Sequence, residues 1–434
     1  GQGRWSSSAG EYSKFGLNPM ELMEALEIAK SKNILDCVKL IHFHLGSQIT
    51  NIRRIKNSLK EVGRFYSELM RFGCNIEYID VGGGLGIDYD GSRSTFASST
   101  NYSVQEYAND VVYHLLEICK SENLPHPNII SESGRAMTAH HSILVVNVLD
   151  VTSFPEWSNE INVSEETPEA VKEIFNVLNS TSNKNLIESW HDAIHLKEEA
   201  QSKFLLGLIS LADRALIERI YWGICRKIEK ISSRLKFLPD DISNLRTRLA
   251  DKYFCNFSVF QSVPDSWAID QVFPVVPLHR LNEEPDRDAT LADITCDSDG
   301  RIDNFIGTNL GTENTLRVHS LKENESYALC IFLTGAYQEI LGDLHNLFGD
   351  TNTVHVSLKE DGTINYEQII EGEDVADVLD YVQFSADELA GRIDGFLIGC
   401  VQRGVVTQQE ADDFLTLYKE GLNGYTYLVK PDAD

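Results

Sequence analysis

Residues 38–48 read VKLIHFHLGSQ, residues 76–86 read IEYIDVGGGLG and residues 128–137 read NIISESGRAM. Each stretch starts with the apolar, often β-branched residues of a strand and ends in glycine, serine or charged residues. Amphipathic stretches that fit helices precede and separate them, at residues 19–32, 53–72 and 104–121. This alternation predicts βα units with a parallel sheet. Such sheets hold their binding sites at the carboxyl ends of the strands, where the polar and glycine-rich residues lie.

The rest of the chain contains three further regions that differ in their sequence patterns. A β-branched run at residues 142–151 leads into a charged helical stretch that predicts an inserted bundle, with one long helix over 197–236. Short β-rich segments follow, beginning with CNFSVFQSV at 255–263, and predict a β-sandwich or β-barrel. The expected domains are residues 1–150, the C-terminal part of an α/β barrel; 160–250, the helical insertion; 251–373, a β-rich domain to which 142–152 contributes; and 374–434, a C-terminal helical domain.

The composition excludes several classes of protein. The 434 residues include 38 Lys and Arg against 66 Asp and Glu, a formal net charge of −28, so the overall field repels nucleic acid and anionic membranes and attracts a small cation. Eight cysteines stand singly, without a CxxC pair, which argues against a zinc ribbon or a disulfide framework and for a reducing compartment. No apolar run reaches the roughly 18 residues of a membrane span. We therefore expect a cytoplasmic protein with no nucleic-acid or membrane partner.

Two histidines stand near the end of the first predicted strand. His42 and His44 lie two residues apart, so we expect both on one face of the sheet. They could share a metal ion with Glu132, but no further His or Cys cluster completes a closed site, and histidines commonly satisfy local hydrogen bonds instead. His44 directly precedes the turn at residues 45–47. There it could lie flat against a planar cofactor.

Glycines and charged residues follow the next two strands. Residues 82–84 and Gly86 are glycines, so backbone N–H groups there can approach an anion closely. The run fits neither the Walker spacing nor GxGxxG, and a tight turn without a ligand is the alternative. Glu132 and Arg135 flank Gly134. They form either a structural ion pair or two walls of a pocket, in which Arg135 binds a phosphate and Glu132 stabilises a protonated ring nitrogen.

Two further candidates lie in the β-rich region. Residues 293–300, DITCDSDG, place the thiol of Cys296 among three carboxylates. A lone cysteine usually fills a core, but these neighbours are polar and turn-forming, so an exposed thiol that donates a proton is the alternative, with the carboxylates holding a cationic substrate. A calcium loop is also considered, although the stretch lacks the length and the closing glutamate of an EF-hand. Tyr337 ends an apolar strand and is either a core-edge residue or a hydroxyl that binds phosphate.

The motifs HFHLGSQ, DVGGGLG, SESGR, TCDSDG and GAYQ, in this order along the chain, resemble those of the alanine-racemase-like decarboxylases that use pyridoxal phosphate. Three features are similar to the members that act on arginine: the helical insertion, CDSDG where diaminopimelate decarboxylases have CESGD, and the run from Gly335 to Thr351. The resemblance covers essentially the whole chain. It implies an α/β plus β fold, with a partial pyridoxal-phosphate-binding (β/α)8 barrel, a helical-bundle insertion, a β-sandwich or β-barrel domain and a C-terminal helical cap.

The family pattern also implies site residues. Those that would hold the cofactor lie in the loops described above: His44 against the pyridine ring, Ser47, Gly83 and Gly84 around the cofactor, Glu132 at the ring nitrogen, and Arg135 and Tyr337 on the phosphate. Cys296 would protonate the carbon that has lost carbon dioxide. Asp297, with Asp299 as a second candidate, would bind the substrate guanidinium. In this family the cysteine and the aspartate come from the partner subunit, so the site would lie at a dimer interface.

The implied reaction is decarboxylation of L-arginine to agmatine and carbon dioxide in polyamine (putrescine and spermidine) synthesis. Pyridoxal phosphate and magnesium are the implied cofactors, with no motif that identifies the magnesium ligands, and the implied assembly is a homodimer or higher homo-oligomer. The alternatives are a decarboxylase of the same fold that acts on diaminopimelate or another amino acid, and a non-catalytic complementing subunit.

One feature departs from the family pattern. The family's Schiff-base lysine lies at the end of the first barrel strand, and no lysine here stands in a matching context. Residues 1–150 also supply about three or four βα units where a closed barrel needs eight strands. We therefore expect this chain to be the C-terminal part of a longer enzyme and to have no decarboxylase activity alone.

Overall fold

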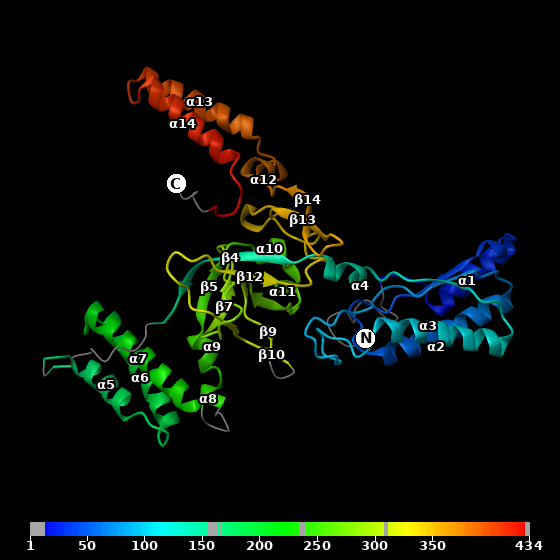
Figure 1. Ribbon diagram of the computed structural model, residues 1–434, viewed down its shortest axis with the longest axis horizontal. Helices are drawn as coiled ribbons and strands as arrows, with labels where there is room; N and C mark the ends of the chain where they lie inside the picture. Colours follow the sequence, from blue (N-terminus) through cyan, green and yellow to red (C-terminus); the bar gives the residue numbers. More distant parts are fainter. Residues whose placement is uncertain (1–13, 155–162, 165, 234–239, 308–310, 430–434) are drawn as a thin grey trace.

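The computed structural model describes residues 14–154, 163–164, 166–233, 240–307 and 311–429. A mixed sheet lies at its centre, and three units extend from it in different directions: an α/β unit from the first third of the chain, a helical bundle, and the C-terminal helices (Figure 1). The predicted fold class is confirmed, with part of an α/β barrel, a helical insertion, a β domain and a C-terminal helical cap. No helix in these described ranges is long and apolar enough to cross a membrane.

The α/β unit contains a three-stranded parallel sheet in the order β1-β2-β3. Its helices begin where the sequence provides a capping side chain: Asn18, in a capping box with Glu21, at α1, Asn51 at α2 and Ser103 at α3. Gly73, at a left-handed φ of 107°, ends α2. The elements are α1 (Pro19–Ser31), η2 (Leu35–Cys37), β1 (Leu40–His42), α2 (Ile52–Phe72), β2 (Tyr78–Asp80), α3 (Val104–Glu122), β3 (Asn128–Ile130), α4 (Gly134–Thr138) and η3 (Ala139–His141).

The strands of this unit are shorter than the apolar stretches suggest. The paired residues run only to His42, Asp80 and Ile130, so His44 lies beyond the end of β1. The expectation that His42 and His44 share one face of a strand is therefore wrong. Phe43 N–H still donates to the Asp80 carbonyl, and the chain then reaches a turn at Gly46, whose φ is 118°.

The central sheet has seven strands. The main path runs β11-β7-β5-β4-β12-β6, and β8 pairs with β7; β5 and β7 are parallel and the other pairs antiparallel. Its strands are β4 (Leu144–Thr152), β5 (Asp251–Cys255), β6 (Val275–Pro277), β7 (Arg287–Ala292), β8 (Arg301–Ile302), β11 (Leu316–Val318) and β12 (Ala328–Ile331), and a small hairpin adds β9 (Phe305–Ile306) and β10 (Thr312–Glu313). The core on this sheet includes Tyr89 and Ala139 from the α/β unit, so the two units share buried side chains.

The segment after β5 is helical rather than β-rich. Residues 255–263 were expected to continue the β region, but β5 ends at Cys255 and α10 (Val259–Ser262) begins. Ser258 caps this helix by accepting from the Gln261 N–H, and α11 (Pro264–Ala268) follows with Pro264 in its first turn. A serine cap and a proline at N1 therefore override the β-branched composition.

The bundle contains α5 (Glu169–Ser180), α6 (Leu186–Leu205), α7 (Leu211–Ser232), α8 (Asp240–Ser243) and α9 (Leu245–Leu249) around a shared apolar core. The prediction of one long helix over 197–236 is wrong, because α6 ends at Leu205 and α7 starts at Leu211. Gly207 has a φ of 72° and its N–H donates to the Phe204 carbonyl, while Leu208 N–H donates to the Lys203 carbonyl, which together form a Schellman motif. Apolar residues continue on both sides of the break, so periodicity alone does not reveal it.

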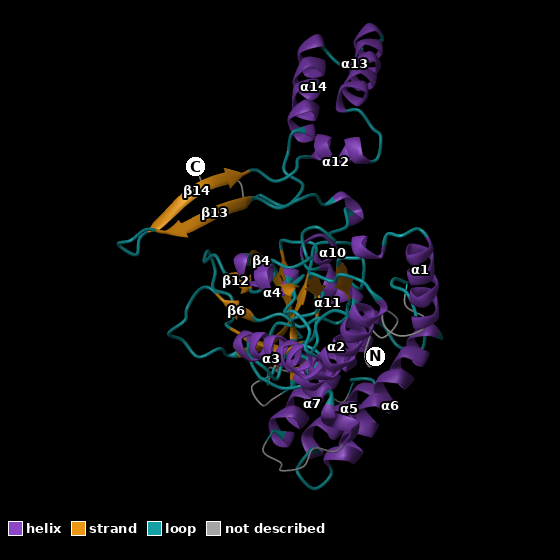
Figure 2. Cartoon of the chain, turned by 90° about the vertical axis from the view of Figure 1, so that its right-hand side faces the viewer, coloured by secondary structure: helices purple, strands orange, loops and turns teal. Residues whose placement is uncertain are grey.

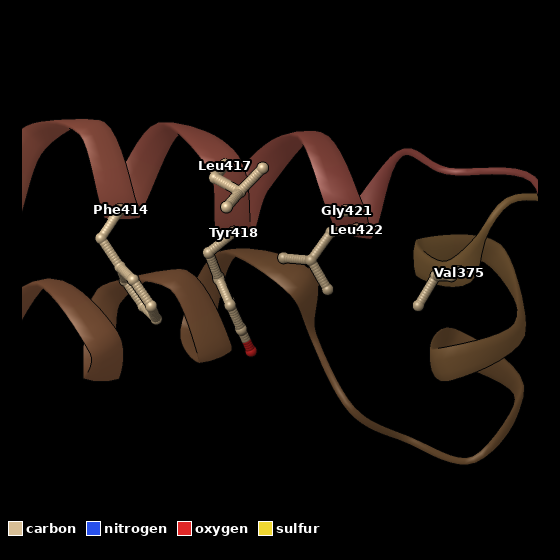
Figure 3. Close-up of a pocket in the computed structure, with 6 residues that line it drawn as sticks. All are labelled: Val375, Phe414, Leu417, Tyr418, Gly421 and Leu422. Atoms are coloured by element: carbon tan, nitrogen blue, oxygen red, sulfur yellow. The ribbon is translucent and has the colours of Figure 1, made fainter. Parts of the chain in front are cut away.

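The C-terminal part stands away from the sheet (Figure 2). It contains η4 (His345–Leu347), the hairpin β13 (Thr353–Leu358) and β14 (Ile364–Ile370), and the helices α12 (Val375–Tyr381), α13 (Ala386–Gln402) and α14 (Gln408–Leu422). An apolar pocket lies between α12 and α14, lined by Val375, Phe414, Leu417, Tyr418, Gly421 and Leu422 (Figure 3). After α14 the chain returns to the body of the protein, where the Tyr427 hydroxyl donates to the Gly349 carbonyl and the Thr426 hydroxyl accepts from the Gly349 N–H.

We expect Ser210→Ala to lower the free energy of unfolding by about 1 kcal/mol, because Ser210 caps α7 in a reciprocal capping box with Asp213. Urea denaturation followed by circular dichroism measures the change. Ser202→Ala is a matched control, since Ser202 is also exposed but bonds only the Glu198 carbonyl inside α6, where alanine favours the helix; we expect a change below about 0.5 kcal/mol. Equal stability of the two variants would show that this cap does not fix the start of α7.

Candidate functional site

A buried arginine lies where the carboxyl ends of the parallel strands meet the central sheet. Arg135, in the first turn of α4, is only 6% exposed. Its Nη1 donates to the Tyr89 hydroxyl at 2.9 Å and its Nη2 donates to Ser47 Oγ at 3.2 Å. The guanidinium carbon lies 4.8 Å from the ring centroid of Tyr337. Nε is also buried but has no hydrogen-bond partner, so one N–H remains to bind an acceptor on a ligand.

The residues around Arg135 come from four separate segments. Ser47 follows β1, Tyr89 follows β2, Arg135 follows β3 and Tyr337 follows β12. Burial raises the pKa of Tyr89 above its usual value of 10, and the adjacent Arg135 charge lowers it in part. Tyr89 therefore keeps its hydroxyl proton at neutral pH and accepts from Arg135 as a neutral group.

Tyr337 is held in place by its buried neighbour. Its backbone is left-handed, with a φ of 71°, and its ring is 44% exposed. Gln338, only 1% exposed, accepts from the Asp265 N–H at 3.1 Å and donates to the Asp265 carboxylate at 2.8 Å. Gly335 N–H donates to the Ala139 carbonyl, which fixes the same loop against the end of the α/β unit. These contacts place the Tyr337 ring over the Arg135 guanidinium.

The glycine loop after β2 packs directly on its neighbours. Gly83 N–H donates to His44 Nδ1 at 3.2 Å. A Cβ at Gly83 would lie 2.7 Å from the Glu132 carbonyl oxygen, and one at Gly84, where φ is 97°, would meet the Gly46 carbonyl. Only glycine allows this approach, so the loop presents backbone rather than side chains at the site. This close packing agrees with both interpretations of the glycines, a tight turn without a ligand and a loop that approaches an anion.

The charged candidates do not pair with one another. Arg135 donates to Tyr89 and Ser47 rather than to Glu132, so the interpretation of Glu132 and Arg135 as an ion pair is wrong. The Glu132 side chain is exposed at the carboxyl end of the sheet. His42 instead contacts Asp80, with Nδ1 at 2.8 Å from Oδ2, while the other oxygen of Asp80 accepts from a loop N–H.

The histidine metal site is not formed. His42 bonds Asp80, and His44 accepts from the Gly83 N–H, so the two rings have different partners. Within the ranges that the structure describes, no group of three or more His, Cys, Asp or Glu side chains is arranged to hold a metal ion.

The candidates of the β domain form a second cluster. Cys296 is exposed, as one of the two interpretations predicted, and Asp297 and Asp299 are exposed beside it. Asn346 Oδ1 accepts from the Cys296 backbone N–H at 3.1 Å, and the Asp297 carboxylate contacts His345 Nε2. The tip of this loop therefore bonds η4 rather than the group around Arg135.

Seven of the candidates predicted from the sequence lie together in one group. Four residues that hold the candidates of the two clusters in place were not predicted. His44, Ser47, Gly83, Gly84, Glu132, Arg135 and Tyr337 lie around the carboxyl ends of β1, β2 and β3, whereas Cys296, Asp297 and Asp299 lie in the second cluster. The missed residues are Tyr89, Gln338, His345 and Asn346. The last three lie inside the run from Gly335 to Thr351, which carried part of the resemblance, so that run was the one signal for them.

Three family models match the chain and define its class. The pyridoxal binding domain of pyridoxal-dependent decarboxylases matches residues 1–139, the helical bundle domain of arginine decarboxylases matches 164–246, and the C-terminal helical extension of arginine decarboxylases matches 375–428. The first match covers the glycine loop and Arg135, and the second covers the bundle. Fold and site thus define a pyridoxal-dependent decarboxylase.

Relatives narrow the class further. The biosynthetic arginine decarboxylase of Bacteroides thetaiotaomicron is 53% identical over 99% of this chain and that of Geobacter sp. (strain M21) is 47% identical, and the chain covers 68% of each. The crystal structure of the biosynthetic arginine decarboxylase from Campylobacter jejuni superposes with a TM-score of 0.81 at 34% identity, over 98% of this chain and 68% of that one. The chain belongs to the family of biosynthetic arginine decarboxylases.

A more distant structure shares the fold alone. The diaminopimelate decarboxylase from M. jannaschii gives a TM-score of 0.52 at 16% identity, over 86% of this chain and 58% of that one. The resemblance to pyridoxal-phosphate-dependent decarboxylases is confirmed by the family models and the relatives given above.

We expect Gly83→Ala to weaken pyridoxal phosphate binding by about tenfold or more, because the new Cβ forces the glycine loop away from the Glu132 carbonyl, an overpacking of about 1–3 kcal/mol. Titration of the native full-length protein with the cofactor, followed by visible absorbance, measures the affinity. Gly391→Ala is the control, because Gly391 lies on α13 with open space around it and should bind normally. Unchanged affinity of Gly83→Ala would contradict the proposed close approach at this loop.

Proposed function

We propose that the native full-length protein decarboxylates L-arginine to agmatine and carbon dioxide with pyridoxal phosphate. Family membership supports the reaction, since the relatives that cover 99% of the chain bear that name. The structural observation that carries the proposal is the buried Arg135 guanidinium with its unpartnered Nε, at the joined ends of three parallel strands. A phosphate group is the ligand that such a fixed guanidinium suits.

The described residues fit the cofactor. Arg135 would bind its phosphate with the free Nε–H, and the Ser47 hydroxyl and the Tyr337 ring both contact the same guanidinium. The glycine loop would admit the cofactor against backbone, since a Cβ at Gly83 has no space. His44 stands beside Gly83 and would lie against the ring. The exposed Glu132 carboxylate would bind the protonated ring nitrogen.

When bound, the cofactor supplies an electron sink for the pair of electrons left on the α-carbon as carbon dioxide departs. The remaining work belongs to side chains of this protein. The Cys296 thiol would donate a proton to the α-carbon and recover one from water, so that agmatine leaves with hydrogen in place of the carboxylate. The carboxylates of Asp297 and Asp299 would bind the guanidinium. The net charge of −28 favours the approach of this cationic substrate.

We propose that the two clusters meet between two copies of the protein, in a homodimer or a larger homo-oligomer. This is supported by the exposure of Cys296 and by its attachment to η4 instead of to the Arg135 group. A two-fold axis would bring the Cys296 loop of one copy to the Arg135 group of the other, and generate two equivalent sites.

The remaining assignments are also proposals. A cytoplasmic location and a role in polyamine synthesis, including spermidine, follow from the activity of the family. Magnesium rests on the resemblance alone, and no cluster of ligands in the described ranges supports it. The alternatives are decarboxylation of diaminopimelate or another amino acid, and a non-catalytic complementing subunit.

We expect the native full-length protein, loaded with pyridoxal phosphate, to release carbon dioxide from L-arginine and to yield agmatine, because the exposed carboxylates beside Cys296 suit a guanidinium. Carbon dioxide release and chromatography of the amine measure the reaction, with diaminopimelate assayed in parallel.

Arg135→Ala, which removes the phosphate ligand, should lower kcat/KM by about a hundredfold or more, whereas Arg392→Ala on α13 should leave it unchanged. Turnover of diaminopimelate alone would refute arginine as the substrate. No turnover of any amino acid by the pure protein would favour the complementing-subunit alternative.

We expect a mixture of Arg135→Ala and Cys296→Ala proteins to regain activity that neither has alone, because each mixed dimer rebuilds one intact site. Random exchange of subunits should give about a quarter of the activity of the unmodified protein. Activity measured before and after mixing under conditions of subunit exchange tests this. If the mixture remains inactive while mass spectrometry shows mixed dimers, the two clusters do not form a shared site.

A further inference from the structure

The loop that carries Cys296 has a fixed base. Asp293 is 3% exposed, and its carboxylate accepts from the Val259 N–H at 2.8 Å and from the Thr295 N–H and hydroxyl at 2.9 and 2.7 Å. Asp293 N–H also donates to the Gly300 carbonyl. A Cβ at Gly300 would overlap the Asp293 carboxylate, so the two ends of the loop are locked together.

The tip of the same loop depends on another segment. Cys296, Asp297, Ser298 and Asp299 are all exposed. Two contacts with η4 hold this tip: Asn346 Oδ1 with the Cys296 N–H, and His345 Nε2 with the Asp297 carboxylate. One contact positions the residue with the thiol, and the other positions the carboxylate next to it.

The η4 turn is built to make both contacts. Asn346 and Leu347 have left-handed φ values of 57° and 61°; asparagine tolerates this conformation, whereas for leucine it is uncommon and indicates that surrounding contacts impose it. The His345 ring lies 4.6 Å from the Phe260 ring, centroid to centroid, and Asp343 N–H donates to the Phe260 carbonyl. The turn is therefore fixed against α10, and consecutive residues direct their side chains to Asp297 and to Cys296.

The contact with His345 leaves Asp297 able to bind a cation. The Asp297 side chain is 49% exposed, and His345 Nε2 contacts only its Oδ2. This contact holds the carboxylate in one orientation and leaves Oδ1 free to accept from a guanidinium N–H.

We propose that His345 is a positioning residue for substrate recognition and that Asn346 is a positioning residue for proton donation. His345 orients Asp297 toward the guanidinium, and Asn346 places Cys296 at the carbon to be protonated. The inference rests on the proposed function and deepens it, because it assigns substrate affinity and turnover to two adjacent residues that do not touch the substrate themselves.

The two roles should separate in steady-state kinetics of the native full-length protein with pyridoxal phosphate bound. We expect His345→Ala to raise KM for arginine by about tenfold or more with kcat within about threefold, because a free Asp297 carboxylate loses orientation. We expect Asn346→Gly to lower kcat by about tenfold or more with KM little changed; glycine keeps the left-handed backbone and removes only the acceptor.

Conservative variants and a neutral analogue distinguish positioning from a general structural role. His345→Gln retains an N–H donor and Asn346→Asp retains an acceptor oxygen, so both should stay within about threefold of the unmodified enzyme. Citrulline, which carries a neutral ureido group in place of the guanidinium, should inhibit the unmodified protein and His345→Ala equally. His191→Ala is the matched control, because His191 pairs with Asp241 on the bundle at similar exposure and should change no kinetic constant.

Several results would overturn the inference. An unchanged KM in His345→Ala would remove the role of His345, and an unchanged kcat in Asn346→Gly would remove that of Asn346. Equal losses in KM and kcat for both variants, not restored by the conservative ones and accompanied by a lower thermal midpoint, would show that η4 acts only in stability. Failure of the unmodified protein to act on arginine would overturn the proposed function and this inference with it, whereas normal activity with unaltered variants would overturn the inference alone.

Discussion

The buried guanidinium of Arg135 is the constraint on which the rest of this structure depends. Burying a charge is costly unless polar groups surround it, and the described partners of Arg135 are two hydroxyls and an aromatic ring, none of which neutralises it. The residue therefore keeps a positive charge in a closed environment and favours an anionic ligand. Its partners come from the loops after β1, β2 and β12, so these loops must meet before the charge is stabilised. The contacts of Arg135 therefore form only when the α/β unit packs on the central sheet.

Buried polar pairs also determine how the two units join. Gln338 makes two hydrogen bonds with Asp265 in a region closed to solvent, and the same core contains Tyr89 and Ala139 from one side and strands β5 and β12 from the other. Hydrophobic burial stabilises the contact, whereas the polar pair requires one particular alignment, because a shifted arrangement would leave a buried amide and a buried carboxylate without partners. The same alignment fixes the position of Tyr337, because it is adjacent to Gln338 in the chain.

Much of this arrangement could be predicted from the sequence, and the failures have physical causes. The alternation of apolar strands and amphipathic helices predicted the fold class, and polar and glycine residues at strand ends indicated seven candidates that the structure brings together. Periodicity did not reveal the break at Gly207, because apolar residues continue across it, and composition suggested strand where Ser258 starts a helix. The partners of the candidates were missed because they are distant in the chain: Tyr89 is 46 residues from Arg135, and Asn346 is 50 residues from Cys296. Local patterns show which side chains are available, and only tertiary packing decides which of them meet.

The return of the chain after α14 has a consequence for the whole molecule. Thr426 and Tyr427 bond both backbone groups of Gly349, two residues beyond the left-handed turn that holds the Cys296 loop. The Tyr427 ring is buried there, so this segment acts as a brace and not as a loose tail. Proteolytic cleavage after Leu422 would therefore free this segment from Gly349. The η4 turn would then be held less firmly, and so would the loop of Cys296, which lies more than a hundred residues earlier in the chain. Residues 426–427 therefore help to hold the segment that follows η4.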